Sequence, residues 1–274
     1  MKKTLDSARF GNAQIDIIQY DEMRGSTDPE VGSVLYFAQK TGINLRQVCI
    51  RLNGDSVATE KGALQYYHGN IQSDNKVTAS GGFGKRLLNT AFNGESFFRP
   101  TYSGYGEVYL EPTFNHYMLI TLDNDSIILD SGMFYCATSS LNVSITTVKN
   151  ISSALFGSDG LTQTVVEGSG ILVVQLPVPE SEIRQIDINN TTLQVDGKFA
   201  LMRTSGVDYK VSMGNKGMMK TLFSGEGLLE TFSGNGTVWL APTYPAYRYL
   251  SEKLNPTKTL LRPSSPNSQP PGDA

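Results

Sequence analysis

The chain has 274 residues, a formal net charge of −3 and only 18% charged residues. This slightly acidic balance lacks the basic surface that holds the phosphates of a nucleic acid, so the composition argues against nucleic acid as a partner. The 27 glycines favour a fold with many turns.

The N-terminal extension, residues 1–44, stands outside the repeats described below. Lysines near its start resemble a signal peptide, but no apolar segment follows them. The longest aliphatic run, Ile171–Val174, is far too short to cross a membrane. We therefore expect a cytoplasmic protein and leave open a peripheral contact with a membrane.

One helix is expected in the N-terminal extension. Asp28 and Pro29 suit the N-cap and the first helical position, and apolar residues follow at helical spacing up to Ala38. Such a helix would end near Gly42. The stretch 33–38 reads equally well as a strand, so both alternatives stay open.

One pattern occurs three times in the rest of the chain. Each copy has a Phe, an acidic residue three positions later, a Gly-x-Gly and an aliphatic segment. The copies are Phe92, Glu95 and Gly104–Gly106; Phe156, Asp159 and Gly168–Gly170; and Phe223, Glu226 and Gly234–Gly236. A second pattern, a polar turn with a short strand, precedes each copy and ends at Gly62, Gly132 and Gly197. The Gly-x-Gly positions are 64 and then 66 residues apart, which indicates tandem duplication.

These patterns predict an all-β domain over residues 45–244. It would consist of three tandem β-repeats of about 65 residues, over 45–112, 113–178 and 179–244, related by pseudo-threefold symmetry. Turn signals at short intervals along the repeats are typical of a β-sandwich or barrel. Residues 245–274 would form a C-terminal segment whose Pro-rich tail is disordered.

Within the repeats, short aliphatic segments between turn residues predict strands at Tyr117–Leu122, Ser126–Leu129 and Gly170–Leu176. We expect another strand to begin at each Gly-x-Gly, with alternate residues on one face. The expected core pairs are Val108 and Leu110, Leu172 and Val174, and Val238 and Leu240. The residues between them are Tyr109, Val173 and Trp239. Their face is apolar enough to be covered by another repeat or by a subunit.

The two cysteines, Cys49 and Cys136, lie in apolar surroundings. Buried free thiols are therefore favoured over a disulfide. A zinc site is not expected, because no Cys-x-x-Cys occurs and only His68 and His116 could assist.

Several segments resemble the altered-inheritance-of-mitochondria protein 24 family. They are Arg51–Ser56, Glu60–Leu64, Phe92–Phe97, Leu222–Leu228 and Gly234–Leu240. The resemblance covers about residues 45–243 and implies a fold related to the tryptophan RNA-binding attenuation protein (TRAP), or similar to a double-stranded β-helix. Eukaryotic members are linked to the organisation of the mitochondrial inner membrane, and the family provides no catalytic residues to carry over. The N-terminal extension and the Pro-rich tail depart from the usual pattern.

Three apolar loops at equivalent positions are the candidate interaction site. Together they would form one face for a partner, a second subunit or a membrane, unless they pack within the monomer. The candidate residues are Phe83, Lys85, Arg86, Leu87, Leu155, Phe156, Met218, Met219 and Leu222.

The repeated acids Glu95, Asp159 and Glu226 have two interpretations. Threefold symmetry would bring three carboxylates to one axis, where they would bind a cation. A structural role, accepting backbone N–H bonds in each turn, better explains why every copy has one. We therefore interpret these acids as structural.

No catalytic constellation is visible. Neither His68 nor His116 accompanies a nucleophile motif, and two distant histidines are too few for a cupin-like metal enzyme. We predict a non-enzymatic protein without cofactor or metal that acts through self-assembly or a protein partner, as a homo-oligomer or scaffold that could work at a membrane surface. The alternative is a small-ligand- or RNA-binding module, by analogy with the fold relative.

Overall fold

The computed structural model describes residues 2–74, 99–148, 161–213 and 228–254. Its strands form one 13-stranded sheet, in which every pair is antiparallel. The main path through the sheet runs β1-β2-β3-β7-β9-β6-β11-β13-β10, and β4, β5, β8 and β12 branch from it. The predicted all-β class is confirmed.

The N-terminal extension folds as a hairpin and a helix: β1 (Lys2–Phe10), β2 (Ala13–Tyr20) and α1 (Pro29–Lys40). β2 pairs with β3 (Leu45–Thr59), so the hairpin continues the sheet. At the start of α1, the backbone N–H of Glu30 donates a 2.8 Å hydrogen bond to the Asp28 side chain. The helix alternative for this stretch is confirmed, and the strand alternative is wrong.

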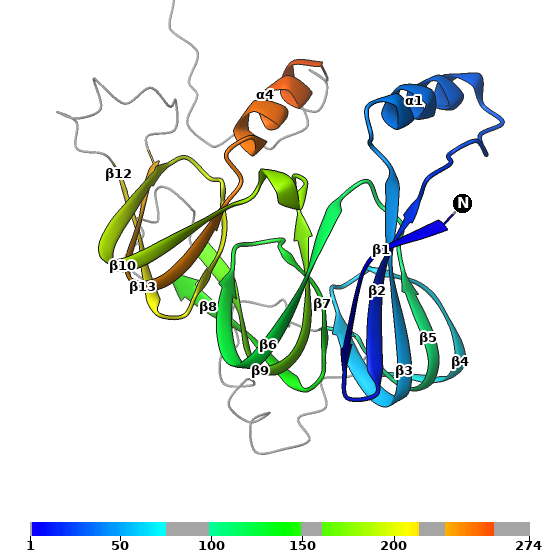
Figure 1. Cartoon of the computed structure of the whole chain (residues 1–274), viewed down its shortest axis with the longest axis horizontal. Coiled ribbons are helices and arrows are strands. Elements are labelled where there is room, and N and C mark those ends of the chain that lie inside the picture. Colours follow the sequence, from blue (N-terminus) through cyan, green and yellow to red (C-terminus); the bar gives the residue numbers. More distant parts are fainter. Residues whose placement is uncertain (1, 75–98, 149–160, 214–227, 255–274) are drawn as a thin grey trace, which may run out of the picture.

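From β3 onward, the strands fall into three groups that lie side by side in a row (Figure 1). The first group is β3, β4 (Leu64–Asp74) and β5 (Thr101–Leu110). The second group is β6 (His116–Leu129), β7 (Phe134–Thr138), β8 (Leu141–Val148) and β9 (Leu161–Leu176). The third group is β10 (Arg184–Asp196), β11 (Ala200–Thr204), β12 (Val207–Met213) and β13 (Leu228–Leu240). The short helix η1 (Glu180–Glu182) precedes β10, and α4 (Tyr244–Leu254) follows β13.

Each group contains a β-bulge in its first long strand. The register shifts between Asn53 and Ser56 in β3, between Leu122 and Asp125 in β6, and between Asn189 and Thr191 in β10. Residues in left-handed backbone occupy these bulges: Gly54, Asn124 and Asn190. The segments predicted as polar turns are therefore bulges within continuous strands, and β6 joins the two predicted strands 117–122 and 126–129.

The Gly-x-Gly segments lie inside β5, β9 and β13, so the prediction that a strand begins at each of them is wrong. Gly106 shows the physical reason for glycine. A Cβ atom at Gly106 would lie 2.1 Å from the carbonyl oxygen of His68 in β4. The glycine allows two backbones to approach each other closely.

The expected core pairs are confirmed. Val108, Leu110, Leu172, Val174, Val238 and Leu240 are all buried. They belong to three hydrophobic clusters, which we call the first, second and third cluster in the order of the strand groups. Cys49 and Cys136 are buried and free, as expected.

The face of β5, β9 and β13 opposite the core pairs is covered in two of the three groups. Val173 is fully buried in the first cluster, and Trp239 packs against the second. Tyr109 instead stacks on Tyr66, with ring centroids 4.5 Å apart. Each of the first two clusters therefore fills its own group and covers the outer face of the next group along the chain, and the first group's outer face carries the Tyr66–Tyr109 pair.

Candidate functional site

The candidate residues of the three loops and the three repeated acids lie outside the described residues. They fall in 75–98, 149–160 and 214–227, and they are Phe83, Lys85, Arg86, Leu87, Glu95, Leu155, Phe156, Asp159, Met218, Met219, Leu222 and Glu226. Their roles stay predictions. The described residues carry exposed apolar side chains elsewhere, on the two helices.

Helix α1 presents an apolar stripe to solvent. Val31, Val34 and Phe37 recur every three residues, which places them on one side of the helix. Val34 and Phe37 are 65% and 66% exposed, and no residue of α1 is fully buried. A helix of this length is marginal on its own in water, so its cap and its contacts with the preceding segment must hold it.

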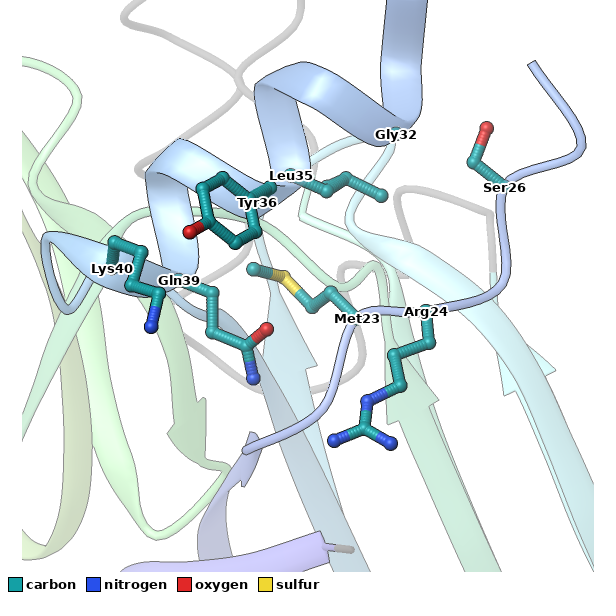
Figure 2. A pocket seen from close by; sticks show the side chains of 8 residues that line it. All are labelled: Met23, Arg24, Ser26, Gly32, Leu35, Tyr36, Gln39 and Lys40. Carbon is teal, nitrogen blue, oxygen red and sulfur yellow. The ribbon is translucent and has the colours of Figure 1, made fainter. Parts of the chain in front are cut away.

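A hollow of about 600 Å³ separates α1 from the segment that leads into it (Figure 2). Met23, which is buried, points toward α1 beneath Leu35 and Tyr36. The Gln39 side chain crosses to this segment and donates a 2.8 Å hydrogen bond to the backbone oxygen of Asp21. These contacts fix α1 over the hollow.

Two cations lie at the edge of the hollow. The Lys40 ammonium lies 5.5 Å from the centre of the Tyr36 ring. Arg24 also lines the hollow and makes no ion pair with the described part of the chain. Apolar walls next to two cations suit an anionic group that carries an apolar chain.

Helix α4 repeats the arrangement of α1. Tyr247, Leu250 and Leu254 follow helical spacing and are 46%, 54% and 78% exposed. The Tyr247 hydroxyl donates a 3.1 Å hydrogen bond to Glu182 of η1, which fixes the base of the helix. The Lys253 ammonium lies over the Tyr249 ring, 5.6 Å from its centre.

Figure 1 shows α1 and α4 projecting from the same side of the row of strand groups. We call the two stripes together the helix face, which consists of Val31, Val34 and Phe37 on α1 and of Tyr247, Leu250 and Leu254 on α4.

A buried polar cluster lies between β11, β12 and β13. Glu230 is 8% exposed, and desolvation raises the pKa of its carboxyl to about 7. The Tyr209 hydroxyl donates a 2.8 Å hydrogen bond to Glu230, and burial raises the pKa of Tyr209 as well. Arg203 Nε donates to the backbone oxygen of Val207, and its guanidinium lies over the Tyr209 ring.

The cavity at this cluster has a volume of about 10 Å³, which admits one water molecule at most. This volume leaves no room for a substrate, and the hydrogen bond between Tyr209 and Glu230 joins β12 to β13. The sequence did not predict this cluster, although Glu230 is the one acid of β13 and stands between apolar residues at 229 and 232.

The two histidines do not form a site. His68 is exposed on β4, and His116 is half-buried at the start of β6, where desolvation lowers its pKa to about 4. In the described ranges, no three His, Cys, Asp or Glu side chains are grouped so that they could hold a metal ion. Within the same ranges, neither helix has the length and apolar character needed to cross a membrane.

The fold and the helix face define an antiparallel β-protein with two surface helices that expose apolar stripes. A family described as Mitochondrial biogenesis AIM24 matches residues 38–243, and the chain belongs to this family. The family resemblance found in the sequence is thereby confirmed.

Two streptococcal proteins are similar to the chain. The uncharacterized protein M6_Spy0233 of Streptococcus pyogenes is 27% identical over 196 residues, which cover 69% of this chain and 77% of the relative. The crystal structure of protein SPYM3_0169 from Streptococcus pyogenes matches with a TM-score of 0.57 and 22% identity, over 77% of this chain and 94% of the other. This second similarity bears on the fold alone.

Proposed function

We propose that the chain is a non-enzymatic binding protein that docks on a membrane surface through its helix face. The observation that carries this proposal is the pair of exposed apolar stripes on one side of the molecule. Burying such side chains in an apolar phase contributes roughly 1–2 kcal/mol each. Six of them, three on each helix, would be enough to hold a folded protein at an interface.

The composition of the two helices supports a membrane surface as the partner. Each helix carries a tyrosine with a lysine ammonium over its ring, Tyr36 with Lys40 and Tyr249 with Lys253. Rings with a polar tip and lysines with an apolar stem prefer the boundary between hydrocarbon and water. A cytoplasmic location with peripheral membrane contact agrees with this function.

A β-repeat scaffold is the second part of the proposal. Three bulges at corresponding places and three clusters, one for each strand group, support tandem repeats over 45–112, 113–178 and 179–244. A TRAP-like pseudo-threefold relation among them stays a prediction. The scaffold would hold α1 before the first repeat and α4 after the third, and so fix the spacing of the two stripes.

A non-enzymatic role is inferred from the same description. The titratable groups with strongly raised pKa values in the described ranges include Glu230 and Tyr209, and these two line a cavity without room for a substrate. Perturbed pKa values mark active sites only where a cleft accompanies them.

Co-sedimentation with liposomes tests the proposal. The wild-type chain should pellet with vesicles of phosphatidylcholine and phosphatidylglycerol. A variant with Val34→Ser, Phe37→Ser, Leu250→Ser and Leu254→Ser should lose at least about tenfold in binding. The matched control is Tyr105→Ser, which removes a 61% exposed side chain of β5 that belongs to neither helix. A wild-type chain that stays in the supernatant with every vesicle would refute membrane docking.

The hollow beside α1 favours a second candidate function, small-ligand binding. A single-chain anionic amphiphile, such as dodecyl phosphate, would place its chain against Met23 and its anion near Arg24 and Lys40. Titration of the wild type and of Arg24→Gln with dodecyl phosphate tests it, and equal affinities would exclude this site. Mixed RNA at low salt serves as the comparison ligand, because phosphate contacts strengthen steeply there.

A further inference from the structure

Neighbouring strand groups are joined in the same way at two places. At the first joint, Val57, Ala58 and Thr59 of β3 pair with Thr138, Ala137 and Cys136 of β7. At the second joint, Ile127, Ile128 and Leu129 of β6 pair with Thr204, Arg203 and Met202 of β11. In both joints, one side is the segment just after the bulge of one group, which we call the post-bulge segment. The other side is a strand of the next group, which we call the receiving strand.

The backbone hydrogen bonds that flank the joints also correspond. Ser139 N donates to Ser56 O at 2.9 Å in the first joint, and Ser205 N donates to Ser126 O at 3.2 Å in the second. The two joints therefore share one register and one hydrogen-bond pattern.

The third group has a post-bulge segment, but among the described residues no receiving strand pairs with it. Residues 193–195 of β10 follow the bulge as residues 57–59 and 127–129 do, and they pair with β13 on one side. Among the described residues, no strand pairs with the other side of β10. Gln194 is exposed there, whereas its counterparts Ala58 and Ile128 are half-buried in their joints.

The first group has a receiving strand, but among the described residues no post-bulge segment pairs with it. Tyr66–His68 of β4 pairs with β5 just after a register shift, as Cys136 pairs with β9 and Met202 with β13. Cys136 and Met202 are 0% and 3% exposed in their joints, but Tyr66 is 47% exposed. Within the described part of the chain, β4 pairs with β5 alone.

We infer that β10 of one copy of this chain pairs antiparallel with β4 of a second copy. The register of the two internal joints assigns the partners: Leu193 opposite His68, Gln194 opposite Tyr67 and Val195 opposite Tyr66. Gly69 N of the second copy would donate to Thr192 O, as Ser139 and Ser205 do within the chain. We call these two segments the β10 edge and the β4 edge.

The packing on the outer faces supports the same pairing. The first cluster covers the outer face of the second group, and the second cluster covers that of the third. The third cluster includes Val195 and Phe232, and no further strand group follows it among the described residues. The outer face of the first group carries the stacked pair of Tyr66 and Tyr109, which is the matching apolar surface.

The two edges lie at opposite ends of the row (Figure 1), so one chain cannot join its own edges in this arrangement. A contact between different surfaces of identical copies is heterologous, and it continues until a ring closes or a filament grows. The inferred interface is separate from the helix face, so membrane docking and edge pairing can each fail without the other.

Proline variants test the inferred hydrogen bonds. Ser139 N donates to Ser56 O, and the counterparts of these residues are Gly69 in β4 and Thr192 in β10. The backbone N–H and C=O groups of even-numbered residues of β10 and of odd-numbered residues of β4 therefore face the second copy. Gln194→Pro and Tyr67→Pro therefore each remove an N–H that faces the second copy, and an edge strand tolerates proline. Gln194→Thr and Tyr67→Thr are the matched controls, because they keep the N–H.

Light scattering after gel filtration provides the readout. The wild type and both Thr controls should exceed the mass of a dimer, and each Pro variant should run as a monomer of 29.9 kDa. A mixture of the two Pro variants should give only a dimer, because each supplies one intact edge. A monomeric wild type at its highest soluble concentration, or a Pro variant that assembles like the wild type, would overturn the inference.

A cross-link keeps the inference testable if a Pro variant does not fold. Residues opposite each other in a non-hydrogen-bonded pair have Cα atoms about 4.5 Å apart, within reach of a disulfide. His68→Cys with Leu193→Cys should give a ladder of oligomers under oxidation that reductant removes. Ile71→Cys with Leu193→Cys lies three residues, roughly 10 Å, out of register and should give none. Equal ladders from both pairs would contradict the assigned register.

Discussion

Tyr209 donates a 2.8 Å hydrogen bond to the carboxyl of Glu230, one strand away in the sheet. Both side chains are largely buried, and the carboxyl has a pKa of about 7 because burial disfavours its charged form. The charged groups around Glu230 are Asp130, which raises this pKa, and Lys198 and Arg203, which lower it. The third strand group thus holds an acid that is half-ionised near neutral pH.

This pair predicts a fall in stability with rising pH. The pKa of Glu230 is higher in the folded state than the ordinary 4.5, so folding favours the protonated form. Its contribution is fully present below about pH 4.5 and is lost as the pH rises through about 7. The loss is about 3 kcal/mol at most, because a tenfold change in proton affinity corresponds to about 1.4 kcal/mol. The thermal midpoint of the wild type should therefore fall between about pH 5 and about pH 8.

Glu230→Gln should flatten this part of the pH profile, because the amide still accepts from Tyr209 but does not ionise. Asp130 acts in the same direction, since burial raises its pKa too, so a smaller slope will remain. Glu167→Gln is the control, because this acid of β9 is exposed and its replacement should leave the profile unchanged. If the Glu230→Gln variant kept the full wild-type slope, Glu230 would not be responsible for it.

The cap of α1 gives a second prediction. Asp28→Ala removes the acceptor for Glu30 N and should destabilise the helix by about 1 kcal/mol. Since no residue of α1 is fully buried, the loss is local and the thermal midpoint of the sheet should hardly change. Hydrogen exchange should accelerate about fivefold in α1 and not in β3.

Asp28→Ser is the matched variant, because serine caps a helix as well as aspartate does. It should keep the slow exchange of α1. Global unfolding of Asp28→Ala at a clearly lower temperature would mean that α1 is coupled to the sheet more tightly than its exposure indicates.

The sequence predicted the elements that follow a simple period. The alternation at Val108 and Leu110, and at its two counterparts, identified the core faces of β5, β9 and β13. Asp28 and Pro29 identified the start of α1 because an N-cap acts locally. Burial of the free cysteines followed from their apolar neighbours.

Other features depend on contacts that no local pattern contains. The β1–β2 hairpin was missed, although Ala13, Ile15 and Ile17 alternate and lie in the first cluster. Helix α4 was not predicted within the C-terminal segment, because the Pro-rich tail dominated its composition. The helix face was not predicted either, since exposure of an apolar stripe depends on how α1 and α4 leave the sheet.

The glycine at 106 provides a third prediction. Its φ of +153° and the distance of 2.1 Å from a built Cβ to His68 O leave no room for a side chain. Gly106→Ala should destabilise the protein by more than about 1 kcal/mol, because the clash is with backbone that cannot rotate away. Gly25→Ala, with nothing within 4 Å of its Cβ, should leave the denaturant midpoint unchanged. Equal midpoints for the two variants would disprove the close approach of β4 and β5.

The last prediction separates the helix face from the fold. Val34→Ser with Phe37→Ser replaces two side chains that are about two-thirds exposed, so the free energy of unfolding should change by less than about 0.5 kcal/mol. Leu172→Ala, which removes a fully buried side chain from the second cluster, should cost about 2–5 kcal/mol in the same urea titration. If the helix variant were destabilised like the core variant, the stripe would have to be packed against another part of the chain. Stability unchanged together with lost vesicle binding is the result expected of a docking face, because such a face gains its burial only when the partner is present.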